Sequence, residues 1–212
     1  MRLKLDPHKL YVASLFAGKG DVRYYLNGVC IEKHPVEGAY LIGTNGHTLC
    51  ALYDQTAIVE MDQQEIILPI ESKIQTKLKH AKAETATFYG SQLHVLQENS
   101  STPDIFVTSA IDGTFPNWRR VLPSEIDVNN SQEKLGVYNT DYLANFTLLS
   151  KVLGKFPRVR LFNPANENGP LVGVLPDWPQ SLIVIMPMLA EDAVATLDLS
   201  WITESQSAAH AA

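Results

Sequence analysis

The sequence Ile-Asp-Gly-Thr-Phe-Pro-Asn-Trp-Arg-Arg-Val-Leu-Pro occupies residues 111–123, just past the midpoint of the chain. Gly113 follows an aspartate and indicates a turn, because glycine tolerates a positive φ angle. The two prolines favour an irregular backbone that neither continues a helix nor donates fully to a sheet. Its apolar side chains, Phe115, Trp118 and Val121, carry too much apolar surface for a free linker. The stretch therefore predicts a packed connector between two parts of the chain.

Composition and charge exclude several protein classes. The chain has 212 residues, of which 45% are hydrophobic and 19% charged, so it can bury a folded core. A net charge of −6 argues against a surface covered with phosphate-binding residues, although it leaves room for a local basic face. The start of the chain lacks a signal-peptide core, and no apolar run approaches the roughly 18–20 residues of a membrane helix. We therefore expect a cytoplasmic protein with no membrane segment, in which Cys30 and Cys50 stay reduced.

A strand, a helix and three strands recur three times along the chain, judged from apolar periodicity and turn residues. In the first repeat we expect a strand at 3–5, a helix at 8–17, and strands at 22–32, 39–43 and 49–53. In the second we expect a strand at 65–68, a helix from 69 to about 83, and strands at 85–89, 93–97 and 105–109. In the third we expect a strand at 135–138, a helix ending at Gly154, and strands at 159–162, 171–175 and 182–186. This order predicts an α+β fold with an internal structural repeat.

The third repeat predicts only half a domain. Two repeats can share one domain of sheets and helices, whereas a third is left with an exposed sheet edge and an uncovered helix face. That half is expected to need a partner. From about residue 189 the composition changes to an acidic extension, which still contains Leu197, Leu199 and Trp201. These apolar residues predict that part of the extension docks against something.

The sequence lacks the motifs of common enzymes and metal sites. Residues 17–21 hold a Gly-Lys pair without the upstream glycine and the following Ser or Thr of a phosphate-binding loop. No Cys-x-x-Cys or His-Glu-x-x-His pattern offers a metal site, and no Gly-x-Ser-x-Gly motif offers a nucleophile. The six histidines share no ligand spacing. We therefore expect no catalysis, no cofactor and no metal ion.

Four runs of residues are specific enough to indicate a family. They are Asp-Val-Arg-Tyr-Tyr-Leu-Asn-Gly at 21–28, Thr-Asn-Gly-His-Thr-Leu at 44–49, Asp-Gly-Thr-Phe-Pro-Asn-Trp-Arg-Arg-Val-Leu-Pro at 112–123 and Val-Ile-Met-Pro-Met at 184–188. On these runs, which occur in the family's order, the chain resembles the bacterial DNA sliding clamp, the beta subunit of DNA polymerase III.

The resemblance implies the DNA-clamp fold, in which antiparallel sheets lie outside and helices line one face. Residues 1–124 resemble the complete middle domain of the clamp, with two units. Residues 125–188 resemble only the second half of its last domain, and residues 189–212 form the acidic extension. A closed ring in this family contains twelve units, so chains of three units would close one as a homo-tetramer.

Four lysines are the DNA-facing residues that the resemblance implies: Lys73, Lys77, Lys79 and Lys82. Their spacing spreads them over a broad face of the predicted second helix, where they can meet phosphates without reading sequence. On charge alone, an ordinary solvated helix surface is the simpler interpretation. The resemblance favours non-specific contact with the backbone of duplex DNA.

The resemblance also implies an apolar pocket between the two domains that holds short peptides of polymerases or repair proteins. Carried over run by run, its residues are Leu26, Thr44, Gly46, His47, Leu49, Pro116, Arg120, Val121, Val184, Met186, Pro187 and Met188. Apolar residues would supply a floor, the methionines would adapt to different anchors, and His47 and Arg120 would form a polar rim. Taken singly, His47 is a turn residue and the methionines are core residues. The three walls together favour a pocket.

Two features depart from the family. Asn45 and Thr48 stand where the family has aspartate and arginine, so the pocket loses a charged edge. The extension beyond residue 188 offers Trp201 with two leucines, which would either compete for the pocket or cover the open sheet edge.

The expected function is that of a shortened sliding-clamp-like processivity factor for DNA replication or repair. It would self-associate around or along duplex DNA and bind short peptides of polymerases or other partners. Two alternatives are open. One is a regulator or decoy that binds the same peptides or the host clamp without loading on DNA, and the other is a stand-alone binding module.

Overall fold

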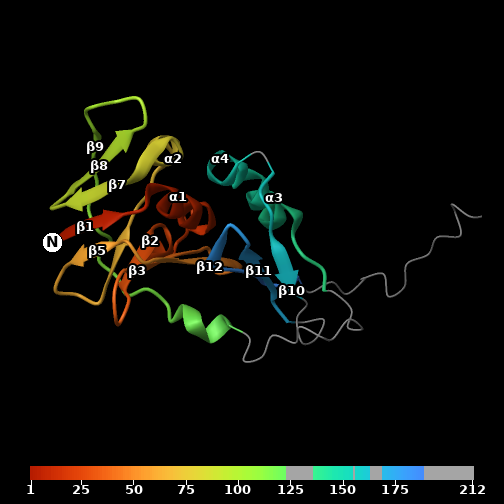
Figure 1. Ribbon diagram of the computed structural model, residues 1–212. Helices are drawn as coiled ribbons and strands as arrows, with labels where there is room; N and C mark the ends of the chain where they lie inside the picture. The colour runs from red at the N-terminus through yellow and green to blue at the C-terminus, as the bar shows by residue number, and fades with distance from the viewer. Residues whose placement is uncertain (123–135, 155, 163–168, 189–212) are drawn as a thin grey trace, which may run out of the picture.

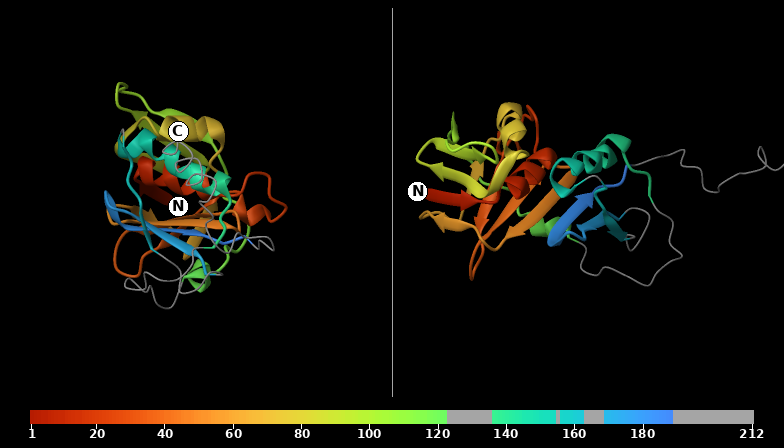
Figure 2. Two further views of the ribbon diagram at one scale, coloured as in Figure 1. Left: turned by 90° about the vertical axis from the view of Figure 1, so that its right-hand side faces the viewer. Right: turned by 45° about the horizontal axis from the view of Figure 1, so that its top comes forward.

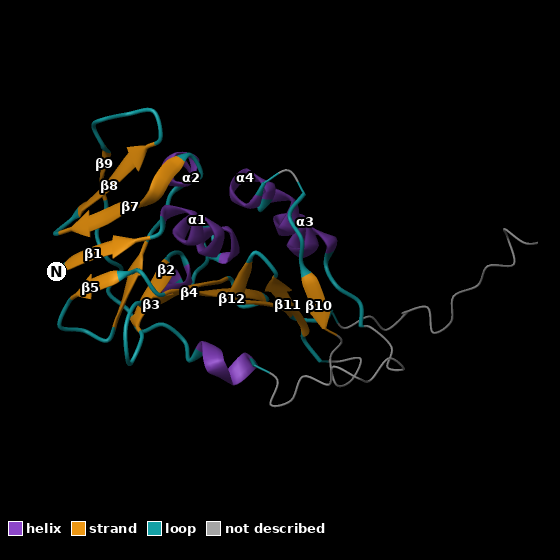
Figure 3. Cartoon of the chain, in the orientation of Figure 1, coloured by secondary structure: helices purple, strands orange, loops and turns teal. Residues whose placement is uncertain are grey.

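The computed structural model describes residues 1–122, 136–154, 156–162 and 169–188. These residues form two antiparallel sheets, one of five strands in the order β5-β1-β7-β8-β9 and one of seven in the order β10-β11-β12-β4-β3-β2-β6. Figure 1 shows the α-helices gathered on one side of the seven-stranded sheet, and the two views of Figure 2 agree. The 3₁₀ helix η2 lies on the opposite side, as Figure 3 shows. The predicted α+β class, with helices along one face, is confirmed.

The elements follow the three predicted repeats. The first contains β1 (Arg2–Leu5), α1 (Pro7–Phe16), η1 (Tyr24–Leu26), β2 (Val29–Lys33), β3 (Ala39–Thr44), β4 (Thr48–Asp54) and β5 (Ile58–Glu60). The second contains β6 (Glu65–Leu68), α2 (Ser72–Leu78), β7 (Ala81–Tyr89), β8 (Gln92–Gln97), β9 (Asp104–Val107) and η2 (Trp118–Val121). The third contains α3 (Thr140–Leu148), α4 (Ser150–Leu153), β10 (Arg160–Phe162), β11 (Leu171–Leu175) and β12 (Trp178–Ile185).

The central helix α1 is fixed by its cap and by burial. The carboxylate of Asp6 accepts hydrogen bonds from the backbone N–H groups of His8 (2.8 Å) and Lys9 (3.1 Å), which satisfies two donors that a helix start leaves open. Eight of the ten residues of α1 are buried. Gly43 of β3 lets this helix approach closely, because a Cβ atom there would lie 1.9 Å from the carbonyl oxygen of Ala13. The core therefore sits around α1, between the two sheets.

The first two units exchange their first strands. β1 pairs with β7 of the second unit, with Leu5 opposite Ala86. In return β6 pairs with β2 of the first unit, with Leu68 opposite Val29. Since α1 also contacts α2, the two units form one body that neither can make alone.

The third unit joins the first through one strand pair. β12 runs antiparallel to β4, from Ser181 opposite Leu52 to Ile185 opposite Thr48. This seam makes the seven-stranded sheet continuous across residues that the sequence predicted to lie in two domains.

Several elements differ from the prediction. β5 was not predicted, the third helix divides into α3 and α4, and β12 begins at Trp178 rather than at residue 182. The second helix ends at Leu78 and not near residue 83, because Ala81 already starts β7 and is buried against β8. The strand expected at 22–32 begins with the 3₁₀ helix η1 and becomes β2 only at Val29. Of the strand expected at 135–138, Val137 forms a single bridge with Met188, and residue 135 lies outside the described part of the chain. The acidic extension from 189 also lies outside it.

Candidate functional site

The face of the seven-stranded sheet that carries η2 holds an apolar surface across the β4–β12 seam. Its buried members are Leu26, Cys30, Ile42, Leu49, Ala51, Ile67, Phe115 and Val184. Side chains alternate between the two faces of a strand, so residues that pair across strands form rows. One row contains Val184, Leu49 and Thr44, and the next contains Leu182, Ala51 and Ile42. The seam between the first and third units is therefore an apolar strip.

The predicted pocket residues divide into a buried and an exposed group. Leu26, Thr44, Leu49 and Val184 are buried, and three of them belong to the apolar surface. Exposed residues around them are Gly46, His47, Pro116, Arg120, Val121, Met186 and Met188, and Pro187 is half-buried. The backbone N–H of Met186 donates to the carbonyl oxygen of His47 at 2.9 Å, which joins the hairpin to the end of β12.

The hairpin between β3 and β4 is held by hydrogen bonds around Asn45. The side-chain oxygen of Asn45 accepts hydrogen bonds from the backbone N–H of His47 (2.9 Å) and Thr48 (2.8 Å), and from the hydroxyl of Thr48 (3.1 Å). The hydroxyl of Thr44 donates to the carbonyl oxygen of Thr48 at 2.6 Å. These neutral side chains thus form a hydrogen-bonded network that fixes the loop.

Arg23 also stabilises this hairpin through contacts of its side chain. Its guanidinium pairs with Asp21 at 2.7 Å and donates to the carbonyl oxygen of Asn45 at 3.0 Å. Gly46, with a φ of +86°, leaves room for it, because a Cβ atom there would lie 2.6 Å from the guanidinium. The hydrogen bonds from Arg23 lower the pKa of Asp21 to about 2, so the pair stays charged in mild acid.

His47 connects the hairpin to the third unit. Its ring stacks on the ring of Tyr142 in α3, with centroids 6.0 Å apart and planes 13° apart. An exposed turn residue of the first unit therefore contacts a helix of the third unit.

Glu32 ties η2 to the sheet. Its carboxylate accepts hydrogen bonds from the indole N–H of Trp118 (2.9 Å) and from two guanidinium nitrogens of Arg119 (2.8 and 3.1 Å). The Arg119 guanidinium also lies over the ring of Trp118, 4.2 Å from its centroid, and over the ring of Tyr40. Desolvation raises the pKa of Glu32, but the hydrogen bonds from Arg119 and Trp118 outweigh it, and the net pKa is lowered. The carboxylate is therefore charged at neutral pH.

The sequence predicted Arg120 as the polar pocket residue of the η2 segment. It did not predict the residues that hold η2 against the sheet. Arg119, Trp118 and Glu32 make the contacts, whereas Arg120 is exposed at the rim. The one available signal was Trp118, which already marked the connector as a packed segment. Its partner Glu32 is remote in sequence, and no local pattern links them.

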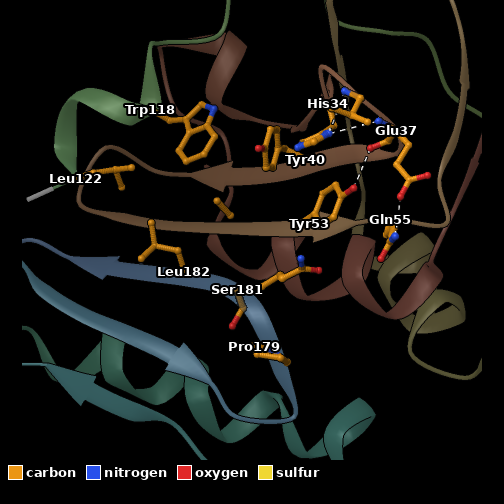
Figure 4. Close-up of a pocket in the computed structure, with 13 residues that line it drawn as sticks. His34, Glu37, Tyr40, Tyr53, Gln55, Trp118, Leu122, Pro179, Ser181 and Leu182 are labelled. Carbon is orange, nitrogen blue, oxygen red and sulfur yellow. Dashed lines mark hydrogen bonds between the residues drawn. The ribbon is translucent and has the colours of Figure 1, made fainter. Parts of the chain in front are cut away.

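A hollow of about 610 Å³ opens on the same sheet face (Figure 4). It is lined by His34, Val36, Glu37, Tyr40, Ala51, Tyr53, Gln55, Trp118, Leu122, Pro179, Gln180, Ser181 and Leu182. None of the twelve predicted pocket residues lines it. Ala51 and Leu182 form the row next to Leu49 and Val184, about 7 Å away at two residues along a strand. The hollow therefore lies on the same sheet face as the predicted residues Leu49 and Val184, one row of side chains away.

Aromatic rings form one wall of the hollow. The rings of His34 and Tyr53 lie 4.7 Å apart, those of Tyr53 and Tyr40 5.7 Å, and those of Tyr40 and Trp118 5.8 Å. Pro179, Ser181 and Leu182 of β12 form the opposite wall, as Figure 4 shows. Such an aromatic, apolar hollow with a few polar groups suits an apolar anchor of a peptide.

The four predicted DNA-facing lysines do not share one helix. Lys73 and Lys77 lie on α2, Lys79 follows its last residue, and Lys82 lies on β7. Lys73 pairs with Glu71 at 3.1 Å and Lys77 with Asp104 at 3.0 Å. Two of the four predicted lysines, Lys73 and Lys77, thus already form ion pairs with carboxylates.

Within the described ranges, no group of three or more His, Cys, Asp or Glu side chains is arranged to hold a metal ion. No helix in the described part of the chain is long and apolar enough to cross a membrane.

Sequence comparison relates the chain to bacterial clamps over half its length. It is 31% identical to the beta sliding clamp of Vibrio cholerae over 106 residues, which are 49% of this chain and 27% of that protein. It is 32% identical to the beta sliding clamp of Pseudomonas aeruginosa over 108 residues, 49% of this chain and 28% of that protein. The matched region thus spans about a quarter of the relatives' length. No family model matches the chain.

Structural comparison extends over most of the chain. The sliding clamp of Pseudomonas aeruginosa, solved with a ligand, superposes with a TM-score of 0.64 and 19% identity over 90% of this chain and 66% of that one. The clamp of Bartonella birtlesii, solved with griselimycin, gives a TM-score of 0.65 and 16% identity over 89% of this chain and 66% of that one. The sequence match confirms the predicted resemblance to bacterial sliding clamps, and the superposition confirms the DNA-clamp fold.

Proposed function

We propose that this chain is a non-enzymatic, cytoplasmic, sliding-clamp-like accessory protein of DNA replication or repair. It self-associates around or along duplex DNA and binds short peptides of polymerases or repair proteins in the groove along the β4–β12 seam. The proposal needs no cofactor, since holding a peptide and surrounding DNA involve no covalent chemistry.

The observation that supports the proposal is the apolar surface across the β4–β12 seam, which contains buried Leu49 and Val184. We infer that it is the floor of a groove bounded by the hairpin, η2 and the end of β12. The adjoining hollow adds room for a large side chain. An apolar floor with a polar rim is the usual architecture for capturing a short segment of a partner.

Griselimycin is the probe for the groove, because the clamps of Pseudomonas aeruginosa and Bartonella birtlesii have been solved with it bound. We expect measurable binding by calorimetry. Met186→Lys combined with Met188→Lys places two charges on the rim and should weaken binding at least about tenfold, a loss of 1.4 kcal/mol. Ile58→Lys is the matched control, since Ile58 is similarly exposed but lies on β5 of the other sheet. Equal binding by all three proteins would reject the groove.

The DNA side is tested separately. Changing Lys73, Lys77, Lys79 and Lys82 together to Glu should abolish retention of the protein on circular duplex DNA without changing griselimycin binding. Retention by the wild type should fall with salt and be lost when the DNA is linearised, because contacts with phosphates are electrostatic and a ring slides off an end. Arg2→Glu with Arg158→Glu, which lowers the net charge by 4 where the quadruple variant lowers it by 8, is a partial control for charge changed away from α2. Unchanged retention of the quadruple variant would reject the lysine assignment.

Ring closure sets the expected stoichiometry. With three units per chain, a ring of twelve units takes four chains, and closed symmetric assemblies are the rule among homo-oligomers. Light scattering at micromolar concentration should then give four times the chain mass of 23.5 kDa. A stable monomer would end the ring proposal.

One observation favours a second candidate, a regulator that binds clamp-directed peptides without loading on DNA. Lys73 and Lys77 are already paired with carboxylates, and the net charge of the chain is −6, so the helix side is weakly basic at best. This candidate predicts griselimycin binding with no retention on circular DNA at any salt concentration.

A further inference from the structure

The first and second units show which strand pairs a complete unit makes. After its helix, each has a strand that pairs with the first strand of another unit: β2 lies beside β6, and β7 lies beside β1. The first strand β6 is used on both edges. Ile67 lies opposite Cys30 of β2 on one side and bridges Ile111, which follows β9, on the other.

The third unit repeats only half of this arrangement. Val137 precedes α3 as Ile67 precedes α2, and it bridges Met188, which follows β12 as Ile111 follows β9. Among the described residues, the second edge of Val137 has no strand beside it. The corresponding strand β10 is likewise the last of the seven-stranded sheet. Two complementary edges are therefore open on one unit.

The helices and side chains of the third unit show the same deficit. α1 buries eight of its ten residues, whereas α3 and α4 bury none of theirs. Apolar side chains around the open edges are exposed: Val137 by 41%, Phe156 by 80% and Leu161 by 49%. The first strands of the other units are covered, with Leu3 and Leu68 fully buried. An exposed sheet edge with apolar neighbours is a surface for pairing.

We propose that two copies of this chain join their third units about a two-fold axis, each placing its segment around Val137 as a strand beside β10 of the other, and so complete one two-unit domain between two chains. The proposal rests on the self-association proposed above and names its surface. A second copy is the occupant that fits, because the edge needs both a first strand and a β10, and the third unit offers one of each. Such a contact is self-complementary, as a two-fold interface requires.

The internal repeat fixes the register. Gly43 and Gly173 are equivalent, since Gly43 lies opposite Cys50, Gly173 lies opposite Ile183, and Cys50 and Ile183 face each other across the seam. The residues before these glycines, Ile42 and Val172, lie opposite Cys30 and Phe162 respectively.

Phe162 is therefore the counterpart of Cys30, and Val137 that of Ile67. Because Cys30 faces Ile67 within the chain, Phe162 of one copy should face Val137 of the other.

A second open edge allows the ring to close. β4 and β12, each the third strand after the helix of its unit, pair with each other, whereas β9, the corresponding strand of the second unit, ends the five-stranded sheet and exposes Val107. If β9 pairs with β9 of another copy as β4 pairs with β12, two different two-fold contacts alternate. Four chains then close a ring of twelve units.

The register is tested with the double variant Val137→Cys/Phe162→Cys under mild oxidation. Directly opposite residues of antiparallel strands have Cα atoms about 4.5–5.5 Å apart, within the range for a disulfide. We expect a covalent dimer on non-reducing gels and no larger species, because a two-fold contact is closed after two chains. The single variants are controls, and the native Cys30 and Cys50 are buried. A monomer only, or a ladder of larger species, would overturn the proposal.

The second measurement is the mass in solution of Val137→Lys/Leu161→Lys, which places charges on exposed positions. Light scattering should show half the mass of the wild type, with griselimycin binding unchanged. An unchanged mass would overturn the interface while leaving self-association intact. A monomeric wild type would overturn both the interface and the ring. If the wild type did not bind griselimycin, this result would contradict the peptide function but not the interface.

Discussion

Replacing Glu32 with alanine should detach η2 from the sheet. The change removes the acceptor of three hydrogen bonds, one from Trp118 at 2.9 Å and two from Arg119 at 2.8 and 3.1 Å. Hydrogen bonds to a charged group contribute about 1.5–3 kcal/mol when buried. The Arg119 side chain is 45% exposed, so solvent reduces its share to about 0–1 kcal/mol. The expected loss in free energy of unfolding is therefore about 2 kcal/mol.

Calorimetry and amide exchange measure this loss. For a protein of this size, about 2 kcal/mol lowers Tm by roughly 4–8 °C if the chain unfolds as one unit. If η2 detaches locally, the amide of Leu122, which donates to the carbonyl oxygen of Arg119, should exchange faster while the sheet stays protected. Griselimycin binding should weaken in either case, because Trp118 of η2 lines the hollow beside the proposed groove.

Glu60→Ala is the matched control. It removes a carboxylate that is 3.9 Å from Arg2 and well exposed on both partners, a pair of small expected value. If Glu32→Ala changed neither Tm nor the exchange of Leu122 more than this control does, the assigned role of Glu32 would be wrong.

Three further predictions concern other contacts. Gly43→Ala should lower the free energy of unfolding by several kcal/mol in denaturant titrations, because its Cβ would lie 1.9 Å from the carbonyl oxygen of Ala13 and force α1 away; a loss below about 1 kcal/mol would contradict this close approach. The carboxyl of Asp21 should titrate by NMR near its pKa of about 2, and Arg23→Ala should return this pKa to the ordinary range of aspartate. Since the pKa in the folded protein is lower than in the unfolded chain, the Asp21–Arg23 pair stabilises the fold at neutral pH. This stabilisation is lost only as the pH falls toward the folded pKa. The two cysteine thiols should resist alkylation at pH 8 in the native protein and react on unfolding, as mass spectrometry would show, because burial raises their pKa; rapid native labelling would contradict their burial.

Local patterns predicted most of the elements. The strands at 65–68 and 171–175 match β6 and β11, and the first helix is displaced by one residue. These segments are bounded by turn residues and proline, which fix ends independently of distant contacts. The second helix was drawn too long because alanine and lysine favour helix, whereas pairing of Ala81 with β8 decides in favour of strand.

The candidate site was predictable only in part. The runs at 44–49, 112–123 and 184–188 located the seam, because each is a local sequence signal. The hollow beside it is built from Tyr40, Tyr53 and Trp118, which meet only through strand pairing and the position of η2. The Glu32–Arg119 contact joins residues far apart in the chain, and no spacing rule reaches that distance.

The exchange of first strands between units has a kinetic consequence. β1 precedes its partner β7 by two α-helices and five strands, so Leu5 can pair with Ala86 only after those elements have been synthesised. Contacts between residues so distant in sequence make folding slow. In the third unit the same strand pairing, if it is made between copies, requires two chains to associate. Completion of that unit would then be second order in protein, and a dilute sample should finish folding measurably later than a concentrated one.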